Sequence, residues 1–447
     1  MIGLFAGKTK DTARYAGFSI SRRGEDVEVN IDDVDVARTM FLKQTQSRYK
    51  PLVALLRSAF GHRVMIVSDA EPWRKTSEAM KAFFAAAHVT RTYGPVIDRL
   101  AQETFAGIAE TSRQATPPAP VELDVERVMR RLTCRILGFV LFGHALSVED
   151  ATFAEDCLDR STRVIDHPVL NPINFIMSAV FKAVNLGDWQ PVIFPRRQRQ
   201  TLTRFMNWLS HRIDFSHAQA VEAPLLAALD ARYKTLPPKR RRTAICAEYA
   251  MLFIAGIETT AAALTFALAE IANSPALIRG VTDEARSGSA AAQPQISAVL
   301  QETLRRHTIV PTMLRVAARA CPMTAKRAGA GKAEADLVIP KGAVLRYLPV
   351  LNHMRRSLWK DPYRFRPERH ADLTSEQKKA HQAFGLGPQS CPGRALATHE
   401  AVSILTSLFQ HLDVLPAPLT EAIATERNAV FTMRPLDVRL RVSAAGI

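Results

Sequence analysis

From residue 243 to residue 272 the chain carries a helical pattern of nearly continuous apolar residues, and no proline interrupts it. A surface helix keeps one polar face toward water, whereas a helix that is apolar on almost all sides lies in the core of a large protein. This segment therefore predicts a long buried helix. It makes a mostly helical fold the simplest interpretation of the chain.

The composition agrees with one large domain. The 447 residues are 47% hydrophobic and 23% charged, which is ordinary for a globular protein with an ample core. The sequence contains no long glycine/serine linker, repeat or low-complexity segment, and residues 117–120 indicate a short loop between helices. We expect a single domain over residues 1–447.

Several features of the sequence bear on its compartment. The N-terminus lacks the basic-then-apolar order of a signal peptide, and no window offers about 18 uninterrupted apolar residues, so we expect no transmembrane anchor. The five cysteines are scattered without a CxxC pair, which argues against a disulfide framework or a structural zinc site. We expect a reduced, cytoplasmic protein.

The formal net charge of +16 suggests an acidic partner, an anionic membrane surface or nucleic acid. The densest basic run, residues 239–242, follows two prolines and precedes the apolar helix, so a solvated loop and helix start explain it. No aromatic-interleaved basic strand or zinc-finger spacing accompanies the run. We therefore expect no nucleic-acid partner.

A lone cysteine, Cys391, stands in residues 384–397, which read FGLGPQSCPGRALA. Gly385 and Gly387 allow backbone conformations closed to other residues and a close approach to a flat ligand. A cysteine at a helix start feels the positive end of the helix dipole, which favours the thiolate, and N–H groups around the sulfur tune a bound metal. A metal-ligating cysteine and a buried free cysteine both remain possible on this segment alone.

The long helix contains the sequence Ala255-Gly256-Ile257-Glu258-Thr259-Thr260. A glycine inside a helix costs roughly 1 kcal/mol relative to alanine, and a buried acid costs more unless it is paired or hydrated. A threonine hydroxyl can bond back to a carbonyl one turn earlier. This combination suits proton delivery to a ligand lying across the helix, with Glu258 and Thr259 as catalytic candidates. The structural alternative is an interior hydroxyl beside a salt-bridged glutamate.

Glu302 and Arg305 lie three residues apart, on one face of a predicted helix. An exposed pair of this kind contributes only a few tenths of a kcal/mol. An apolar extended segment at 309–315, strands near 337–342 and 344–351, and a proline-punctuated loop at 359–369 follow. We expect Arg369, from that loop, to meet the Glu302/Arg305 pair.

In this order, residues 255–260, 302–305, 365–369 and 384–397 resemble the cytochrome P-450 family of haem-thiolate proteins. Upstream, residues 68–73 resemble the entry to the family's helix C and residues 141–143 the end of its helix E. The resemblance spans nearly the whole chain. It implies a mainly α fold with small β-sheets, and haem b (iron protoporphyrin IX) as the cofactor.

The resemblance implies a role for each matching residue. Cys391 would be the axial iron ligand, Thr259 would steady bound oxygen, and Glu258 would belong to the proton relay. Further haem-contacting positions are Trp73, Arg315, Phe384, Gly385, Gly387, Gln389, Gly393, Ala397, Ala255 and Gly256.

The resemblance also implies a support and a substrate pocket. Glu302, Arg305 and Arg369 would form a buried triad that supports the cysteine loop. Residues 59–65, 309–314 and 430–433 would line a largely apolar pocket.

Two positions depart from the family pattern. Gln389 stands where the family usually has Arg or His, and Ser77 stands where it usually has a basic residue. Both usual groups neutralise haem propionates. We expect Arg74, Lys75 or Arg315 to compensate.

The resemblance implies a soluble, bacterial-type monooxygenase that inserts one atom of O2 into a largely apolar small organic substrate by hydroxylation or epoxidation. Thiolate ligation favours O–O cleavage, and the haem carries the hard chemistry. Electrons would come from a separate ferredoxin or flavodoxin with its reductase, and the basic surface suits an acidic carrier. A fatty acid, terpenoid or polyketide fits as substrate, within secondary metabolism.

Three alternatives remain open. One is a haem-thiolate peroxygenase or isomerase that needs no external electrons, although Glu258 and Thr259 argue against it. The second is a non-catalytic haem sensor. The third is a haem-free helical protein with a decayed site.

Overall fold

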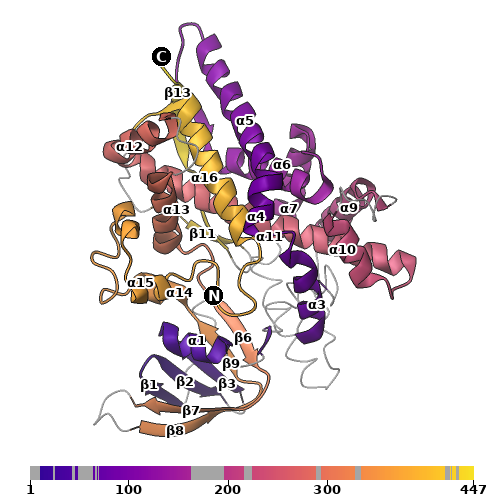
Figure 1. The fold of residues 1–447 in the computed structure, drawn as a ribbon, viewed down its shortest axis with the longest axis vertical. Coiled ribbons are helices and arrows are strands. Elements are labelled where there is room, and N and C mark those ends of the chain that lie inside the picture. Colours follow the sequence, from indigo (N-terminus) through magenta and orange to yellow (C-terminus); the bar gives the residue numbers. More distant parts are fainter. Residues whose placement is uncertain are drawn as a thin grey trace.

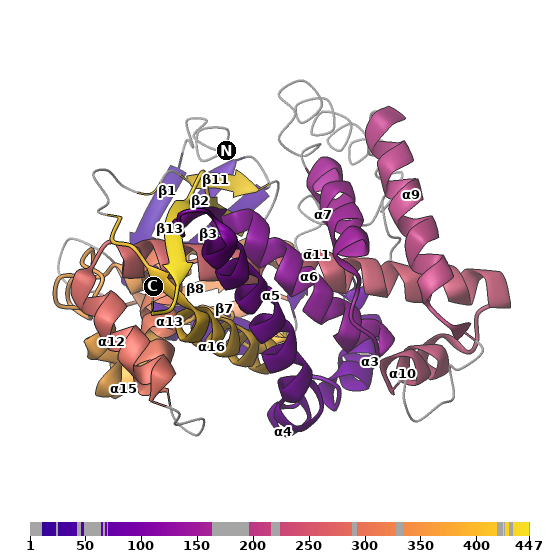
Figure 2. The same ribbon diagram turned by 90° about the horizontal axis from the view of Figure 1, so that it is seen from above.

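The computed structural model describes residues 11–23, 26–42, 46–48, 64–65, 68, 70–162, 196–215, 224–287, 293–327, 334–417, 423, 425–428 and 432–446. Long helices fill the upper part of Figure 1, and most strands lie at its lower end with α1. Viewed from above, α9 and α10 lie at the end of the molecule opposite α12 and α15 (Figure 2).

The longer helices form the larger part of the fold. They are α3 (Ala70–Lys81), α5 (Gly94–Gln114), α6 (Val125–Phe142), α7 (Val148–Thr162), α9 (Arg196–Arg212), α10 (Pro224–Tyr233), α11 (Pro238–Ala272), α12 (Pro275–Arg286), α13 (Pro294–His307) and α16 (Arg394–His411). The shorter ones are α1 (Val34–Leu42), α4 (Ala86–His88), the π-helix η3 (Val89–Tyr93), α14 (Pro349–His353), the 3-10 helix η7 (Pro367–Ala371) and α15 (Ser375–Ala380).

Helix α11 is the long buried helix that the apolar pattern predicted. It begins at Pro238 rather than residue 243, because a proline is tolerated in the first turn, where its missing N–H has no helical partner. The basic run 239–242 therefore belongs to that first turn. By length and composition α11 is also apolar enough to cross a membrane, but 67% of its most apolar window is buried inside the protein. Its packing against α6, α13 and α16 is that of a core helix.

The strands of the described residues form four small sheets. Their bounds are β1 (Asp11–Tyr15), β2 (Phe18–Arg23), β3 (Asp26–Ile31), β4 (Gln46–Arg48), β5 (Val121–Asp124), β6 (Met313–Ala317), β7 (Cys321–Lys326), β8 (Glu334–Ile339), β9 (Val344–Tyr347), β10 (Leu412–Val414), β11 (Thr425–Asn428), β12 (Thr432–Pro435) and β13 (Arg439–Ala444). The sheet orders are β1-β2-β3-β9-β6-β4, β10-β13-β5, β11-β12 and β7-β8.

One predicted strand is shorter than expected. The strand placed at 344–351 ends at Tyr347, and α14 follows from Pro349. Proline cannot donate to a sheet but fits the first turn of a helix, which explains the change of structure at this point. β9 pairs in parallel with β3, with Val29 opposite Leu345, so it joins the N-terminal strands to the rest of the fold.

Two hydrophobic clusters hold the molecule together. The larger surrounds α11 and draws on α5, α6 and α16, and the smaller lies between the six-stranded sheet and α1. Phe384 packs against the larger cluster and Leu386 belongs to the smaller. The loop before Cys391 therefore lies where the helical core meets the sheet core. The prediction of a mainly α fold with small β-sheets is confirmed.

Candidate functional site

The cysteine loop turns tightly before α16. Gly385 and Gly387 have φ angles of 85° and 78°, a conformation that disfavours every residue with a Cβ. The backbone N–H of Cys391 donates to the Phe384 carbonyl at 2.8 Å, which closes the loop. Gly393 is the N-cap of α16, so Cys391 stands just before a helix start, as its sequence predicted.

Cys391 differs from the other cysteines. All five are free and four are buried, whereas Cys391 is exposed. The residue is exposed as a whole, but its sulfur lies among many protein atoms, and this burial raises the pKa of the thiol. The Gly393 backbone N–H, which donates to the sulfur, and the Arg394 charge act in the opposite direction. The pKa of the free thiol is therefore raised although Cys391 stands before a helix start, because desolvation is the largest cause.

The Glu302 cluster stands behind this loop. Glu302 and Arg305 are fully buried and form a two-point ion pair, with both N···O distances at 2.8 Å. Arg369 donates to Glu302 at 3.1 Å, so the predicted contact of Arg369 with the pair is confirmed. The His370 ring, at 2.9 Å, and the Arg366 backbone N–H, at 3.0 Å, complete the set.

Electrostatics make Glu302 a permanent anion. Burial by itself would raise the pKa of Glu302, yet hydrogen bonds from Arg305 and His370 and the Arg305 charge lower it to about 2. A buried carboxylate is tolerated only when it is paired in this way.

A chain of hydrogen bonds connects the Glu302 cluster to the cysteine loop. Arg305 donates to the His353 carbonyl at 2.7 Å, and the Gln382 backbone N–H donates to the His353 ring at 3.0 Å. The Gly385 N–H then donates to the Gln382 carbonyl at 3.1 Å. These contacts favour a structural role for the cluster, as the resemblance implied.

The middle of α11 is accessible on one side. Between residues 245 and 272, the residues that are not buried are Leu252, Ile254, Ala255, Gly256 and Thr259. Leu252, Ala255 and Thr259 are three and four residues apart and therefore share one helix face. The Thr259 hydroxyl donates to the Ala255 carbonyl at 2.8 Å, which confirms the predicted bond to the preceding turn.

Glu258 points away from that face. Its side chain is buried and pairs with Arg130 of α6, with Nη1 and Oε1 3.9 Å apart. Arg130 also faces Glu155 at 3.5 Å and Glu126 at 3.7 Å. The structure thus combines the two interpretations of this segment, because Glu258 is salt-bridged while Thr259 faces the accessible side. Nothing in the local sequence of α6 singled out Arg130.

The glycine of this segment has a packing role. A Cβ at Gly256 would lie 2.7 Å from Leu137 Cδ1, closer than real side chains approach. Gly256 therefore permits the close approach of α6 and α11. Ala255, which is exposed, remains the better candidate for a groove beside Thr259.

The remaining predicted residues differ in burial and in partners. Trp73 and Ser77 are half-buried on α3, and Ala397 is half-buried on α16. Arg315 of β6 is buried, with its guanidinium 5.7 Å from the Phe41 ring centroid. The Gln389 side-chain oxygen is buried and has no hydrogen-bond partner among the described residues.

The two proposed compensating cations on α3 are already paired. Arg74 lies 3.9 Å from Glu78, and Lys75 lies 2.6 Å from Glu71. All four side chains are largely exposed, so these are weak pairs.

The structure describes only part of the predicted substrate segments. Residues 59–63, 430 and 431 fall outside the described residues. The Met433 backbone N–H donates to the Ile309 carbonyl at 2.7 Å, so two of the three segments meet. Met313 approaches the cysteine loop, 3.8 Å from an ideal Cβ on Gly385.

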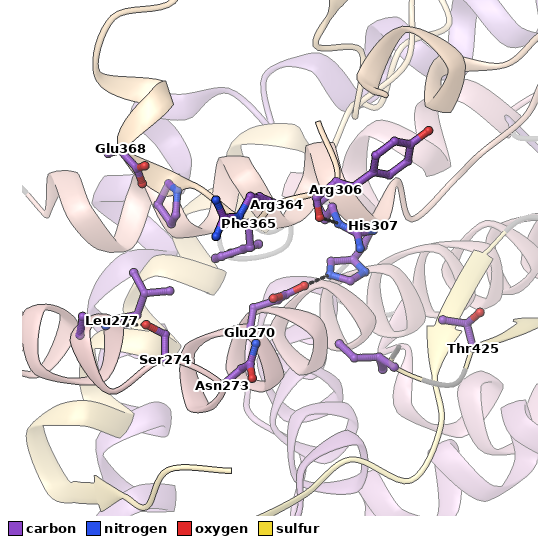
Figure 3. Close-up of a pocket in the computed structure, with 14 residues that line it drawn as sticks. Glu270, Asn273, Ser274, Leu277, Arg306, His307, Arg364, Phe365, Glu368 and Thr425 are labelled. Atoms are coloured by element: carbon purple, nitrogen blue, oxygen red, sulfur yellow. Dashed lines mark hydrogen bonds and ion pairs between the residues drawn. The ribbon is translucent and has the colours of Figure 1, made fainter. Parts of the chain in front are cut away.

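A separate cavity of about 610 Å³ lies between the ends of α11 and α13, η7 and β11 (Figure 3). None of the predicted site residues lines it. A hydrogen bond of 2.7 Å joins the His307 ring to Glu270 in its wall. Burial lowers the pKa of His307, so the ring is neutral near pH 7.

A reachable cysteine in a glycine-shaped loop, before one helix and beside a long central one, defines a haem-thiolate type of site. Comparison with known proteins gives the family. The family model for cytochrome P450 matches residues 13–442, and the chain belongs to this family.

Curated relatives come from several kingdoms. Cytochrome P450 3A13 of Mus musculus is 22% identical over 412 residues, covering 88% of this chain and 77% of that protein. The putative cytochrome P450 135A1 of Mycobacterium tuberculosis is 28% identical over 360 residues, covering 80% and 71%. Cytochrome P450 52A3-A of Candida maltosa is 31% identical over 182 residues, covering 36% and 34%.

The family is one of haem-thiolate monooxygenases, which bind haem b through a cysteine, so the chain is an oxidoreductase. The described residues fit this cofactor. They contain no cluster of three or more His, Cys, Asp or Glu that could hold a metal, whereas Cys391 offers the sulfur of an exposed residue. An ideal Cβ on Gly393 would lie 4.0 Å from that sulfur, so the backbone closely surrounds the donor atom.

Proposed function

We propose that this P450 enzyme inserts one oxygen atom of O2 into a largely apolar small molecule, by hydroxylation or epoxidation. The observation that carries the proposal is Cys391, the one exposed cysteine, whose sulfur accepts the Gly393 backbone N–H. Haem bound there supplies oxygen activation, because a thiolate ligand favours O–O cleavage. The apolar residue Met313 near the loop supports an apolar substrate.

The protein's own residues divide the remaining work. The Glu302 cluster holds the cysteine loop in place through His353 and Gln382. Thr259 presents a hydroxyl on the accessible face of α11. Glu258, which is paired with Arg130 and next to Thr259 in the chain, would be the acid of the proton relay.

The carbon-monoxide spectrum of the reduced protein tests this assignment. We expect absorption at the long-wavelength position of thiolate ligation, and we expect Cys391→Ala to abolish both this band and activity. Cys321→Ala is the matched control, because Cys321 is a buried cysteine in β7. The carbon-monoxide band should persist in this variant. A band that survives Cys391→Ala would show that another residue binds the iron.

We propose a separate acidic electron carrier, a ferredoxin or flavodoxin with its reductase, as the redox partner. The net charge of +16 supports electrostatic association with such a carrier. Charges farther apart than about 8 Å are screened at physiological ionic strength, so the association rate should fall as salt rises. Stopped-flow reduction rates that stay constant across salt concentrations would favour an apolar docking surface instead.

A further inference from the structure

Glu248 is a second buried acid of α11, and the sequence analysis did not single it out. Its side chain is 1% exposed. The Tyr233 hydroxyl of α10 donates to its Oε1 at 2.7 Å, and the Met65 backbone N–H lies 3.1 Å from both carboxylate oxygens. We call Glu248, Tyr233 and Met65 the Glu248 clamp.

The clamp reaches helix α3 by two routes. Beyond Met65, the Ser68 backbone N–H donates to the Val64 carbonyl at 2.9 Å, and the Ser68 hydroxyl donates to the Met65 carbonyl at 3.3 Å. The α3 helix begins at Ala70, directly after this turn. The Tyr233 hydroxyl also interacts with Thr76 of α3. One carboxylate therefore ties α10, α11, α3 and the chain before α3 together.

The position of Glu248 on α11 relates the clamp to the site. Glu248, Leu252, Ala255 and Thr259 follow one another at intervals of four, three and four residues, so they lie along one helix face. Glu248 precedes Ala255 by two turns, which is about 10 Å along the axis. The last three of these residues are accessible, whereas Glu248 is buried. Met65 thus marks the end of the accessible stripe.

A carboxylate at this position is costly. Burial raises the pKa of Glu248 to about 7, even though the Tyr233 and Met65 hydrogen bonds and the Arg232 charge act in the opposite direction. An apolar residue would avoid this desolvation, but it would leave the Met65 N–H and the Tyr233 hydroxyl without an acceptor. The carboxylate of Glu248 is therefore explained by its contacts with Met65 and Tyr233.

We propose that Glu248 is a positioning residue that fixes Met65 at the end of the accessible stripe and so sets how a long apolar ligand lies beside Thr259. This inference rests on the proposed function. Glu248 is not expected to touch the reacting atoms. Its loss should therefore weaken the binding of ligands that extend along α11 without changing ligands that occupy the iron alone.

Two nitrogen ligands of different length test this on the haem-loaded enzyme. Imidazole reaches the iron only, whereas 1-decylimidazole also extends an apolar tail, and both shift the Soret band on binding. Glutamine in Glu248→Gln places an NH2 group where one acceptor oxygen was. We expect 1-decylimidazole to bind about fivefold more weakly, while the affinity for imidazole should change by less than about twofold. A tenfold change in affinity corresponds to about 1.4 kcal/mol.

Glu270→Gln is the matched control. Glu270 is also a buried acid of α11, but it lies about six turns further along the helix, near its C-terminal end, and bonds to His307. The ratio of the two affinities should remain that of the wild type in this variant. Tyr233→Phe provides a milder variant, because it removes the Tyr233 bond and retains the Met65 bonds. It should shift the ratio in the same direction by a smaller factor.

Hydrogen exchange supplies an independent readout. The Met65 amide should exchange faster in Glu248→Gln than in Glu270→Gln, because its acceptor is weakened. Equal affinity losses for both probes, an unchanged affinity ratio or an unchanged Met65 exchange rate would each overturn the proposal. Failure of the proposed function has a different signature, since the wild-type protein would then lack the thiolate carbon-monoxide band.

Discussion

Two buried acids, Glu302 of α13 and Glu400 of α16, behave in opposite ways. Glu302 accepts hydrogen bonds from Arg305, Arg369, His370 and the Arg366 backbone, and its pKa falls to about 2. Glu400 of α16 is equally buried, but its Oε1 has no partner among the described residues. Burial raises the pKa of Glu400 to about 8, with only Thr133 acting against it.

The difference shows that a buried acid keeps a low pKa here when cationic side chains bond to it, as Arg305 bonds to Glu302. The support of the cysteine loop is built around a fixed anion with rigid bonds. The region where α6 meets α11 and α16 instead holds a neutral acid, Glu400, and the long 3.9 Å pair of Glu258 with Arg130. Glu400 in the second region therefore titrates much closer to neutral pH than Glu302 does.

The largest effect is expected at the Glu302 cluster. Glu302→Ala leaves the fully buried Arg305 without its counter-charge, and breaking a buried pair in this way costs about 3–5 kcal/mol. Chemical unfolding of the haem-loaded protein measures this loss. Glu376→Ala is the control, because its ion pair with Lys379 is exposed and should contribute little. Equal losses in both variants would contradict the importance of the Glu302 cluster.

The pH dependence of stability separates the two acids. Because the folded-state pKa of Glu302 is depressed, its contribution is present above its unfolded pKa of 4.5 and is lost as pH falls toward about 2. Because the folded-state pKa of Glu400 is raised, its contribution is present below 4.5 and is lost as pH rises through about 8.

Glu400→Gln should remove the loss on the alkaline side. The neutral amide avoids ionisation in the core, so we expect it to stabilise the protein by about 4 kcal/mol at pH 8 and to change little at pH 4.5. Unfolding free energies at the two pH values decide the matter. A gain of the same size at both would point to better packing and away from ionisation.

The sequence predicted those features of the fold and site that depend on local pattern. The apolar run located α11, and the glycines around Cys391 located the loop before α16. The Glu302 spacing placed an acid and a base on one helix face. Each of these follows from the propensity or periodicity of a short segment.

Contacts between distant segments were not predictable in the same way. Arg130 meets Glu258 from a helix more than a hundred residues earlier, and Met65 meets Glu248 across 183 positions. His370 looked like any residue of a proline-rich loop, yet it donates into the Glu302 cluster. Packing of the helices decides these partners, and no local signal in one sequence specifies it.

A moderate effect is expected on the accessible face of α11. Thr259→Ala removes the hydroxyl beside Glu258, and we expect about fivefold less product per reductant consumed, with peroxide released, equal to about 1 kcal/mol. Thr265→Ala is a close control, because the Thr265 hydroxyl makes the same 2.8 Å bond one turn back but is buried. Undiminished coupling in Thr259→Ala would show that protons travel another way.

The smallest effect is expected beside the cysteine, at Gln389. Its buried amide oxygen has no partner among the described residues, and the cations Arg74 and Lys75 are engaged with Glu78 and Glu71. Where Arg315 does not compensate in their place, haem propionates held by this site would keep uncompensated negative charge, which favours ferric iron. Gln389→Arg adds a charge-assisted hydrogen bond, but partial exposure of the site keeps its contribution below about 1 kcal/mol.

We expect haem transfer from Gln389→Arg to apomyoglobin to be about threefold slower. We also expect the reduction potential to rise by about 30 mV, since a tenfold change in the equilibrium constant of a one-electron reduction corresponds to about 59 mV. Gln410→Arg is a matched control, because Gln410 lies near the far end of α16 and bonds to the Ala285 carbonyl. If Gln389→Arg changes neither quantity, or lowers the potential and speeds haem loss, the propionates already have sufficient cations. The contrast between a compensated charge, as at Glu302, and an uncompensated group, as at Glu400, then does not extend to Gln389.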